Sequence, residues 1–285
     1  AEIKKILIAN RGEIVQRAVR TIREMGKKSV AVYSAGDKNA SYLKHADEAV
    51  CIGGAKSKDS YLNIPAIITA AEMTGCDAIF PGYGFLSENQ DFVEICRLHN
   101  IKFIGPSVEV MEKMADKSKA KEEMIRAGVP VVPGSKGSVH SVTEGKKVAL
   151  EIGYPIMAKA AAGGGGRGMR LIHDESEFDQ LFMAASSEAL AAFGDGTMYL
   201  ERFINNPRHI EVQVVGDSHG NAIHIGERDC SLQRRHQKVI EESPAILLND
   251  ETRAKLHDVA VKATKYLKYE GAGTFEFLAD DKQNI

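Results

Sequence analysis

Apolar residues in the first part of the chain follow two alternating periods, one typical of strands and one typical of helices. The strand-like runs are Lys4–Ala9, Ser29–Tyr33, Ala78–Phe80 and Lys102–Ile104. Helical spacing follows Gly12, ends at the stop signal Gly26, and returns over Ile64–Met73. Strands that alternate with helices favour a parallel sheet with helices on both faces. Residues 1–113 are therefore expected to form a doubly wound α/β domain.

The remainder of the chain, residues 114–285, mixes helices with strands that pair locally. The expected helices are Lys113–Arg126, a helix from Asp174 to Phe193, and Asp250–Leu267. The expected strands are Tyr154–Ala160, Met169–Ile172, Met198–Phe203, Arg208–Val215, Asn221–Glu227 and Gly273–Leu278. Asp174 followed by Glu177 is a helix start of the capping-box type, and the turn Gly216–Gly220 joins two strands into a hairpin. This second part is expected to be α+β.

Composition narrows the class of protein. Among 285 residues, 37 Lys and Arg stand against 39 Asp and Glu, and the net charge of −2 argues against nucleic-acid binding. Apolar residues make up 44%, enough for sizeable cores, and no apolar run reaches the ~18–20 residues of a membrane span. The four cysteines are far apart, which indicates reduced thiols. We therefore expect a cytoplasmic protein whose partners include neither a membrane nor a nucleic acid.

Gly163–Gly168 is the most informative local feature. Consecutive glycines let backbone N–H groups approach a phosphate, but this loop lacks a Walker A ending and precedes a predicted strand rather than a helix. Lys159 lies on the strand face opposite Ile156 and Ala158, where its ammonium can reach a phosphate held under the loop. The pattern therefore favours a flap over nucleotide phosphates, and a tight hairpin with a surface lysine is the alternative.

Four longer stretches carry a family resemblance: Tyr154–Gly168, Ile8–Ile14, Phe80–Asn89 and Glu227–Lys238. The first is similar to the opening signature of the ATP-grasp carboxylases and carbamoyl-phosphate synthetases. The other three resemble biotin carboxylase, nearest to the subunits of bacterial acetyl-CoA carboxylase. The resemblance implies a Rossmann-like pre-ATP-grasp domain over residues 1–113 and an ATP-grasp domain over 114–285, with a glycine-rich flap subdomain at about 132–203.

For function, the resemblance implies ATP-dependent carboxylation of biotin on a biotin carboxyl carrier protein. ATP phosphorylates bicarbonate to carboxyphosphate, this intermediate yields carbon dioxide, and N1 of biotin is carboxylated. This is the first half-reaction of acetyl-CoA carboxylase in fatty acid biosynthesis; a pyruvate, propionyl-CoA or other biotin-dependent carboxylase is the alternative. The implied cofactor besides ATP is Mg²⁺ or Mn²⁺. The implied partners are the carrier protein, a carboxyltransferase component and a second copy in a homodimer.

The resemblance also assigns residues to the nucleotide. Lys117 and Lys159 are expected to bind phosphate oxygens, with Gly165 and Gly166 in the flap above them. Without the resemblance, Lys117 would be interpreted as a solvated helix lysine. The expected contacts from the adenine hinge to the ribose are Glu201, Arg202, Phe203, Ile204, His209, Gln233, His236 and Leu278.

The strand expected over Arg208–Val215 shows clear alternation. His209, Glu211 and Gln213 share one face, and the apolar residues between them face the core. The polar face is thus free to form a site, and the resemblance assigns His209 to the nucleotide. The residues alone would favour a plain surface histidine.

Three further roles concern the chemistry. Lys238 is the expected catalytic residue, because a lysine offsets the negative charge that builds up as bicarbonate meets the γ-phosphate; a basic surface loop is the alternative. Glu276 alternates with Phe275 and Phe277 on a strand where a buried, unpaired carboxylate is costly. A divalent ion resolves that cost, and the resemblance assigns Mg²⁺ or Mn²⁺ to Glu276. Tyr83 is assigned to the biotin site, although its loop equally suits a structural turn.

Three other functions fit parts of the pattern. The strand–helix start suggests an NAD-dependent oxidoreductase, but Ile8–Glu13 lacks Gly-x-Gly-x-x-Gly. The second alternative is a nucleotide-binding module that has no catalytic activity. A carbamoyl-phosphate-synthetase-like enzyme or an amino-acid ligase would share the lysine and the glycine loop, but should lack the block Arg234–Lys238.

The end of the sequence bears on activity. In the family, the strand Gly273–Leu278 pairs with a following strand that carries a Glu-x-Asn metal pair, then a catalytic arginine and a glutamate base. The sequence stops at Ile285, before those residues. We therefore expect this stretch alone to be unable to complete carboxylation, while it retains weak nucleotide binding.

Overall fold

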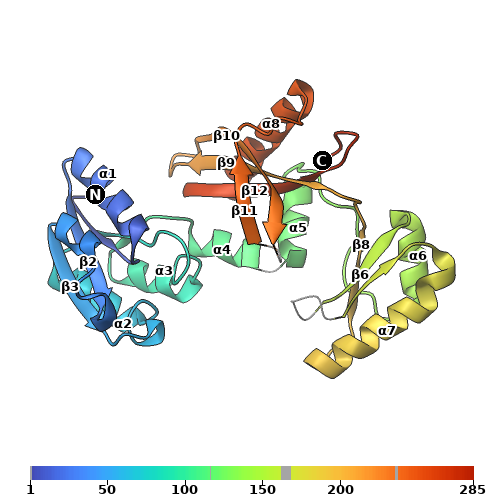
Figure 1. Ribbon diagram of the computed structural model, residues 1–285, viewed down its shortest axis with the longest axis horizontal. Coiled ribbons are helices and arrows are strands. Elements are labelled where there is room, and N and C mark those ends of the chain that lie inside the picture. The colour runs from blue at the N-terminus through green and yellow to red at the C-terminus, as the bar shows by residue number, and fades with distance from the viewer. Residues whose placement is uncertain (1, 116, 162–167, 235–236) are drawn as a thin grey trace. The chain divides into compact units, whose positions relative to one another are not determined.

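The computed structural model describes residues 2–285 apart from 116, 162–167 and 235–236 (Figure 1). The chain divides into two compact units. The first consists of residues 1–119, 215–223 and 264–273, and the second of residues 120–214, 224–263 and 274–285. In the described part of the chain, no helix is long and apolar enough to cross a membrane.

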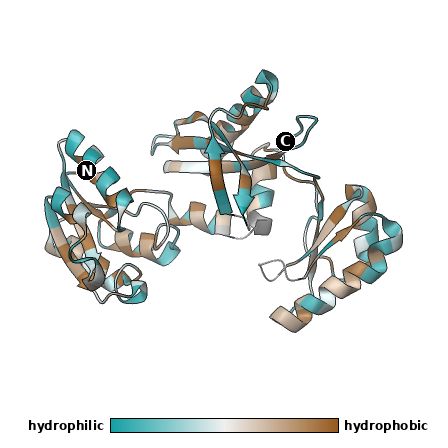
Figure 2. Cartoon of the chain, in the orientation of Figure 1, coloured by the Kyte–Doolittle hydropathy of each residue, from teal (hydrophilic) through white to brown (hydrophobic). Residues whose placement is uncertain are grey.

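The first unit is built on a five-stranded sheet in which all strands run parallel. The strands, in sheet order, are β3 (Glu48–Gly53), β2 (Lys28–Ser34), β1 (Lys5–Ile8), β4 (Ala78–Phe80) and β5 (Lys102–Phe103). The order reverses between β1 and β4, which is the arrangement of a doubly wound fold. Figure 2 shows the apolar strands of this sheet flanked by helices with hydrophilic residues. The predicted doubly wound domain is confirmed.

Two apolar clusters cover the two faces of this sheet. Helix α1 (Glu13–Glu24) packs Val15, Val19 and Ile22 against one face. Helices α2 (Ile64–Met73) and α3 (Gln90–Leu98) pack against the other face, where Leu7 and Ile79 are fully buried. Residues that alternate along a strand thus reach different clusters, which explains why these strands are apolar almost throughout.

Three predictions for residues 48–126 differ from the structure. Strand β3 was not predicted, because only Ile52 of its residues is buried and no alternation appears in its sequence. Helix α3, capped by Asn89, was not predicted although its apolar residues have helical spacing. The predicted helix Lys113–Arg126 begins too late: α4 spans Val108–Ala115 and α5 spans Lys117–Arg126.

The second unit contains a three-stranded antiparallel sheet in the order β7 (Met169–Ile172), β6 (Ile156–Ala160) and β8 (Met198–Arg202). Helix α6 (Val142–Ile152), which was not predicted, and α7 (Glu175–Phe193) supply apolar residues to its core. Phe178 and Phe182 of α7 stack there with ring centroids 5.2 Å apart. Asp174 accepts a hydrogen bond from the Ser176 N–H, so it caps α7 as predicted.

The second sheet of this unit has four strands in the order β11 (Gln237–Glu242), β10 (Ala222–Arg234), β9 (Arg208–Gly216) and β12 (Gly271–Ala279). Helix α8 (Asp250–Leu267) packs on the core formed by the apolar residues of β9, and α5 adds Met124 at its edge. Ile210, Val212 and Val214 are buried in this core, so the predicted alternation of β9 is confirmed. The α+β character of the second part is confirmed by the antiparallel pairs and the helices.

A buried carboxylate ties β10 to α8. Glu227 is 2% exposed, and its oxygens lie 2.9 Å from Nε of Arg253 and 2.6 Å from Nε2 of His257. Burial acts to raise the pKa of Glu227, but the hydrogen bonds from Arg253 and His257 outweigh it and lower that pKa. The His257 ring also stacks on the ring of His224, with centroids 4.0 Å apart.

The stacked histidines predict an acid-sensitive stability. The pKa of His224 is lowered, first by loss of water around its ring and then by His257, while Glu227 opposes the shift. The folded protein therefore binds fewer protons than the unfolded chain, and the stabilisation from His224 is present above pH 6.5 and lost as the pH falls below it. We expect His224→Phe, which keeps a ring in the stack, to show a shallower fall in unfolding free energy over about pH 7 to 5.

The folded and unfolded states differ by less than one proton at His224. Its contribution to the slope of unfolding free energy against pH therefore stays below about 1.4 kcal/mol per pH unit. Denaturant unfolding followed by circular dichroism at several pH values measures it. His219→Phe, on the exposed hairpin turn, is the matched control and should keep the wild-type slope. Equal slopes for wild type and His224→Phe would contradict the prediction.

Candidate functional site

Lys238 lies at the centre of a cluster of charged side chains on the four-stranded sheet. Its Nζ contacts the carboxylate of Glu211 and lies 2.7 Å from Oε1 of Glu276. The three residues come from β11, β9 and β12, which the sheet order brings to one face although they are distant in sequence. Two residues that the resemblance assigned to the chemistry, Lys238 and Glu276, are therefore in direct contact.

Arg228 provides a second cation to the same buried carboxylate. Its Nε lies 2.6 Å from Oε1 of Glu211, and its Nη2 lies 3.1 Å from Oε1 of Gln213. Glu211 lies on the strand face that its sequence pattern predicts, but neither Glu211 nor Arg228 has a role predicted from the sequence. The signal was present, because a glutamate facing the same side as a catalytic lysine needs cationic partners once it is buried.

The electrostatics of this cluster keep Glu211 and Lys238 charged. Glu211 is 4% exposed, and burial acts to raise its pKa, but hydrogen bonds from Lys238 and Arg228 lower it. Partial burial acts to lower the pKa of Lys238, but the two carboxylates outweigh it and raise that pKa. Lys238 is therefore a fixed ammonium group that can attract an anion and cannot serve as a base at neutral pH.

The premise of a buried Glu276 is wrong. Its side chain is 67% exposed and is paired with Lys238, so no large desolvation cost exists for a metal ion to relieve. The alternating pattern of β12 is real, but the face that carries Glu276 is open rather than apolar and enclosed. A metal role for Glu276 thus depends on its donor chemistry and on the resemblance, without the burial argument.

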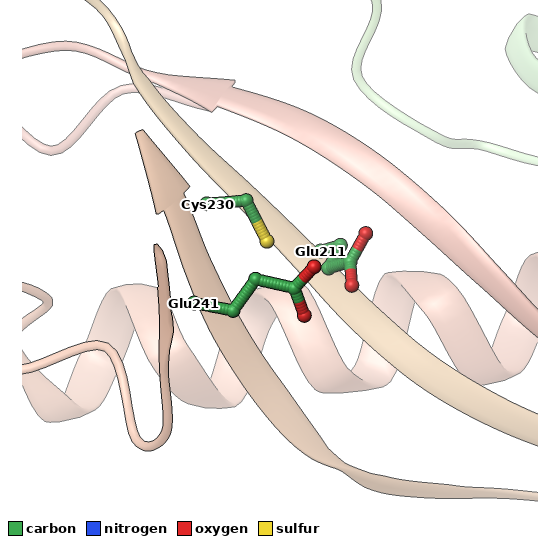
Figure 3. Close-up of side chains that lie close together, drawn as sticks. All are labelled: Glu211, Cys230 and Glu241. Carbon is green, nitrogen blue, oxygen red and sulfur yellow. The ribbon is translucent and has the colours of Figure 1, made fainter. Parts of the chain in front are cut away.

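A second group of possible metal ligands lies next to this cluster. Glu211, Cys230 and Glu241 have ligand atoms within 4.8 Å of one another (Figure 3). Burial first, and then the negative charge of Glu211, raise the pKa of Cys230 to about 11, so its thiol stays protonated and is a poor ligand. The carboxylate of Glu211 is already held by two cations. These side chains therefore do not suit a metal ion.

Lys159 and Glu201 form the second charged pair, on the three-stranded sheet. Lys159 Nζ lies 2.5 Å from Oε2 of Glu201, across the antiparallel pairing of β6 and β8. Ile156 and Ala158 are fully buried on the opposite face, so the predicted alternation of β6 is confirmed. Strands β6 and β7 run antiparallel on either side of the glycine loop as predicted, while Gly165 and Gly166 lie outside the described residues.

The segment assigned to the adenine hinge, residues 201–204, begins in the last two residues of β8 and extends past its end. The N–H of Arg202 donates to the carbonyl of Pro133 at 2.7 Å, and the N–H of Phe203 donates to the carbonyl of Pro155 at 2.9 Å. These two N–H groups are therefore used inside the protein. An adenine at this segment would have to meet its carbonyl groups or the N–H of Ile204.

The other assigned nucleotide residues lie on the four-stranded sheet or outside the described part. His209 on β9 and Leu278 on β12 are partly exposed, and the backbone N–H of His209 donates to Ser231 Oγ. Gln233 on β10 donates its amide to the carbonyl of Cys230 at 2.9 Å. The side chains of Lys117 and His236 lie outside the described residues.

Tyr83 belongs to the first unit and lies in a loop after β4. The buried amide of Asn10 donates to the carbonyls of Pro81 and Tyr83 at 2.8 and 2.7 Å, which fixes this loop. Tyr83 is 62% exposed, and its hydroxyl donates to the carboxylate of Glu13. The loop follows the carboxyl ends of β1 and β4, where the strand order reverses and open parallel sheets bind their ligands.

Comparison with known proteins identifies the family. The family model described as "Biotin carboxylase, N-terminal domain" matches residues 2–111, and "Carbamoyl-phosphate synthase L chain, ATP binding domain" matches residues 116–285, more than half of the chain. A biotin carboxylase from Nostoc sp. (strain PCC 7120) is 57% identical over 97% of this chain and 62% of its own length. The chain belongs to the biotin carboxylase family.

Solved biotin carboxylases share this fold. The complex of biotin carboxylase with β,γ-ATP from Campylobacter jejuni is 67% identical, with a TM-score of 0.86, covering 99% of this chain and 64% of that one. The biotin carboxylase domain of a thermophilic 2-oxoglutarate carboxylase bound to bicarbonate is 48% identical, with a TM-score of 0.93, covering 100% and 62%. The chain thus spans about three fifths of the length of the biotin carboxylases that it matches.

Proposed function

We propose that the intact protein carboxylates biotin at the expense of ATP. The supporting observation is the cluster in which Lys238, held by Glu211 and Glu276, presents a fixed positive charge on the sheet of the ATP-binding domain. In the proposed reaction, bicarbonate oxygen attacks the γ-phosphorus of ATP and releases ADP. Carboxyphosphate then breaks down to carbon dioxide and phosphate, and N1 of biotin passes its proton to the released phosphate and bonds to the carbon of carbon dioxide. Lys238 lowers the barrier by offsetting the negative charge where two anions meet.

The nucleotide site is proposed to use the polar face of the three-stranded sheet. Lys159 and Lys117 would bind phosphate oxygens below Gly165 and Gly166, and Glu201 would accept from the adenine amino group. The hinge and ribose contacts would come from Arg202, Phe203, Ile204, His209, Gln233, His236 and Leu278. The relative from Campylobacter jejuni, solved as a β,γ-ATP complex, supports this proposal.

A divalent ion is proposed at Glu276. The exposed carboxylate of Glu276 is the hard oxygen donor that Mg²⁺ and Mn²⁺ prefer, and its present partner, Lys238, can be replaced by an ion. Such an ion neutralises charge on the terminal phosphates of ATP. Among the described residues, Glu276 is the one that we propose as a ligand of this ion.

The proposed partners are a biotin carboxyl carrier protein, with Tyr83 near the biotin, and a carboxyltransferase component. Two alternatives remain for the carboxylase to which this protein belongs. One is the acetyl-CoA carboxylase of fatty acid biosynthesis. The other is a different biotin-dependent carboxylase, such as the 2-oxoglutarate carboxylase of the solved relative. We further propose residues 1–113 as the pre-ATP-grasp domain and 114–285 as the ATP-grasp domain, with the flap at about 132–203, in a cytoplasmic homodimer.

The test uses the intact protein with free biotin as acceptor. We expect ATP hydrolysis that requires bicarbonate and rises with biotin, together with transfer of label from ¹⁴C-bicarbonate to biotin. A coupled assay for ADP and counting of acid-stable label after stabilisation of carboxybiotin measure the two events. Activation by ammonia or an amino acid, with no label in biotin, would refute the proposal and favour a carbamoyl-phosphate-synthetase-like enzyme or a ligase.

A further inference from the structure

A second cation lies beside the Lys159–Glu201 pair. Lys121 of α5 donates a hydrogen bond from Nζ to the hydroxyl of Tyr199 at 2.5 Å. The same Nζ lies 5.1 Å from the centre of the Tyr199 ring. Tyr199 is opposite Lys159 in the register of β6 and β8. Neither Lys121 nor Tyr199 has a role predicted from the sequence.

The backbone around Lys121 holds its ammonium in place. A Cβ at Gly134 would lie only 2.6 Å from Lys121 Nζ and 2.7 Å from the carbonyl of Leu200. The segment that contains Gly134 runs along β8, where the N–H of Ser135 donates to the carbonyl of Leu200 at 2.8 Å. Loss of water around Lys121 lowers its pKa, and nearby Glu201 opposes that shift. Lys121 is thus a packed, half-buried cation rather than a solvated surface lysine.

Tyr199 and Glu201 are two positions apart on β8, so their side chains leave the same face of the strand. Burial first, and then the nearby carboxylate of Glu201, raise the pKa of Tyr199, so the phenol stays protonated. Tyr199 can therefore accept from Lys121 and donate to Glu201. Glu201 receives support from two directions: Lys159 directly, and Lys121 through the phenol.

In the proposed function, ATP binding removes one of these two cations from Glu201. Lys159 must turn to the phosphates when ATP binds, and it then no longer compensates Glu201, whose side chain is only 24% exposed. A half-enclosed carboxylate without a cation is costly and tends to turn toward solvent. A displaced Glu201 would be a poor acceptor for the amino group of adenine.

We propose that Lys121 is a positioning residue for base recognition: acting through Tyr199, it keeps Glu201 oriented toward the 6-amino group of adenine when Lys159 binds phosphate. This inference rests on the proposed function, because it takes Glu201 and Lys159 as nucleotide contacts. Its consequence is a preference for ATP over ITP. ITP carries an oxygen at position 6, and that oxygen repels a fixed carboxylate instead of donating to it.

The test compares the two nucleotides in the intact protein. We expect Lys121→Met, which keeps length but removes charge, to weaken ATP binding by roughly five- to tenfold, while ITP binding changes less than about twofold. Isothermal titration calorimetry gives both dissociation constants. Tyr199→Phe should reproduce the loss, and the double variant should be no worse than either single variant. Lys147→Met, an exposed lysine on α6, is the matched control and should leave both constants unchanged.

Each outcome decides between the two proposals. If the wild-type protein binds no ATP, or binds ITP equally well, the proposed nucleotide role of Glu201 fails. If wild type prefers ATP and Lys121→Met keeps the same ratio, the inference about Lys121 is overturned. An equal loss for both nucleotides also overturns it, since that result marks a general structural role. Should Lys121→Met not fold, the ATP-to-ITP ratio of Tyr199→Phe, which removes only a hydroxyl, decides the question.

Discussion

Replacing Lys238 with alanine in the intact protein is expected to lower bicarbonate-dependent turnover by roughly 10²- to 10³-fold, the usual cost of removing one group that stabilises developing charge. The dissociation constant for ATP should change less than about threefold, because Lys238 contacts Glu211 and Glu276 rather than the Lys159–Glu201 pair. Steady-state assays with varied bicarbonate, and calorimetry with ATP, separate the two effects.

The control for this variant is Lys262→Ala. Lys262 is exposed on α8 and pairs with Asp258 one helical turn away, so its loss should leave turnover within about twofold. Unfolding of Lys238→Ala must also be measured, since removal of Lys238 leaves the buried Glu211 with Arg228 as its remaining cation. A loss of ATP affinity as large as the loss of turnover would move Lys238 from the bicarbonate site to the nucleotide site.

The second large effect is expected for Glu276→Gln. The amide keeps the shape but removes the charge that a divalent ion requires, so the concentration of Mn²⁺ or Mg²⁺ that gives half-maximal turnover should rise roughly tenfold or more. Turnover as a function of metal concentration at fixed ATP measures the change. The bicarbonate dependence should change less, because Glu211 still holds Lys238.

Glu251→Gln, at the exposed start of α8, is the matched control for Glu276→Gln and should keep the wild-type metal dependence. If Glu276→Gln also keeps it, Glu276 serves only as a partner of Lys238, and the metal ion must be held elsewhere. That outcome would leave the Lys238 prediction unaffected, so the two variants test separate parts of the proposed site.

The spacing of apolar residues predicts most of the helices and strands, because each of them packs one face against a hydrophobic core. The predicted helix Asp250–Leu267 and strand Met169–Ile172 match α8 and β7 at both ends. Strand β11 has the opposite character: all its residues are exposed, so burial leaves no period in its sequence. From the sequence, the segment that carries Lys238 is recognisable only as a block of basic residues. The structure shows that it is a strand, through its pairing with β10.

The candidate site was harder to predict than the fold. Lys238 is 27 positions from Glu211 and 38 positions from Glu276, and the three meet because β9 lies between β10 and β12 in the sheet. No local pattern predicts such an order of strands. The resemblance assigned roles to Lys238 and Glu276 separately, whereas the partnership with Glu211 and Arg228 required the folded chain.

Glu227 and Arg228, neighbours on β10, have consequences for engineering this protein. Glu227 binds Arg253 and His257 of α8, while Arg228 binds Glu211 beside the catalytic lysine. A substitution at Arg253 or His257 therefore acts on the strand that carries Arg228, and through it on the charged cluster. Changes at these two positions of α8 chosen only to improve heat resistance would also act on Lys238, so stability and turnover are coupled there.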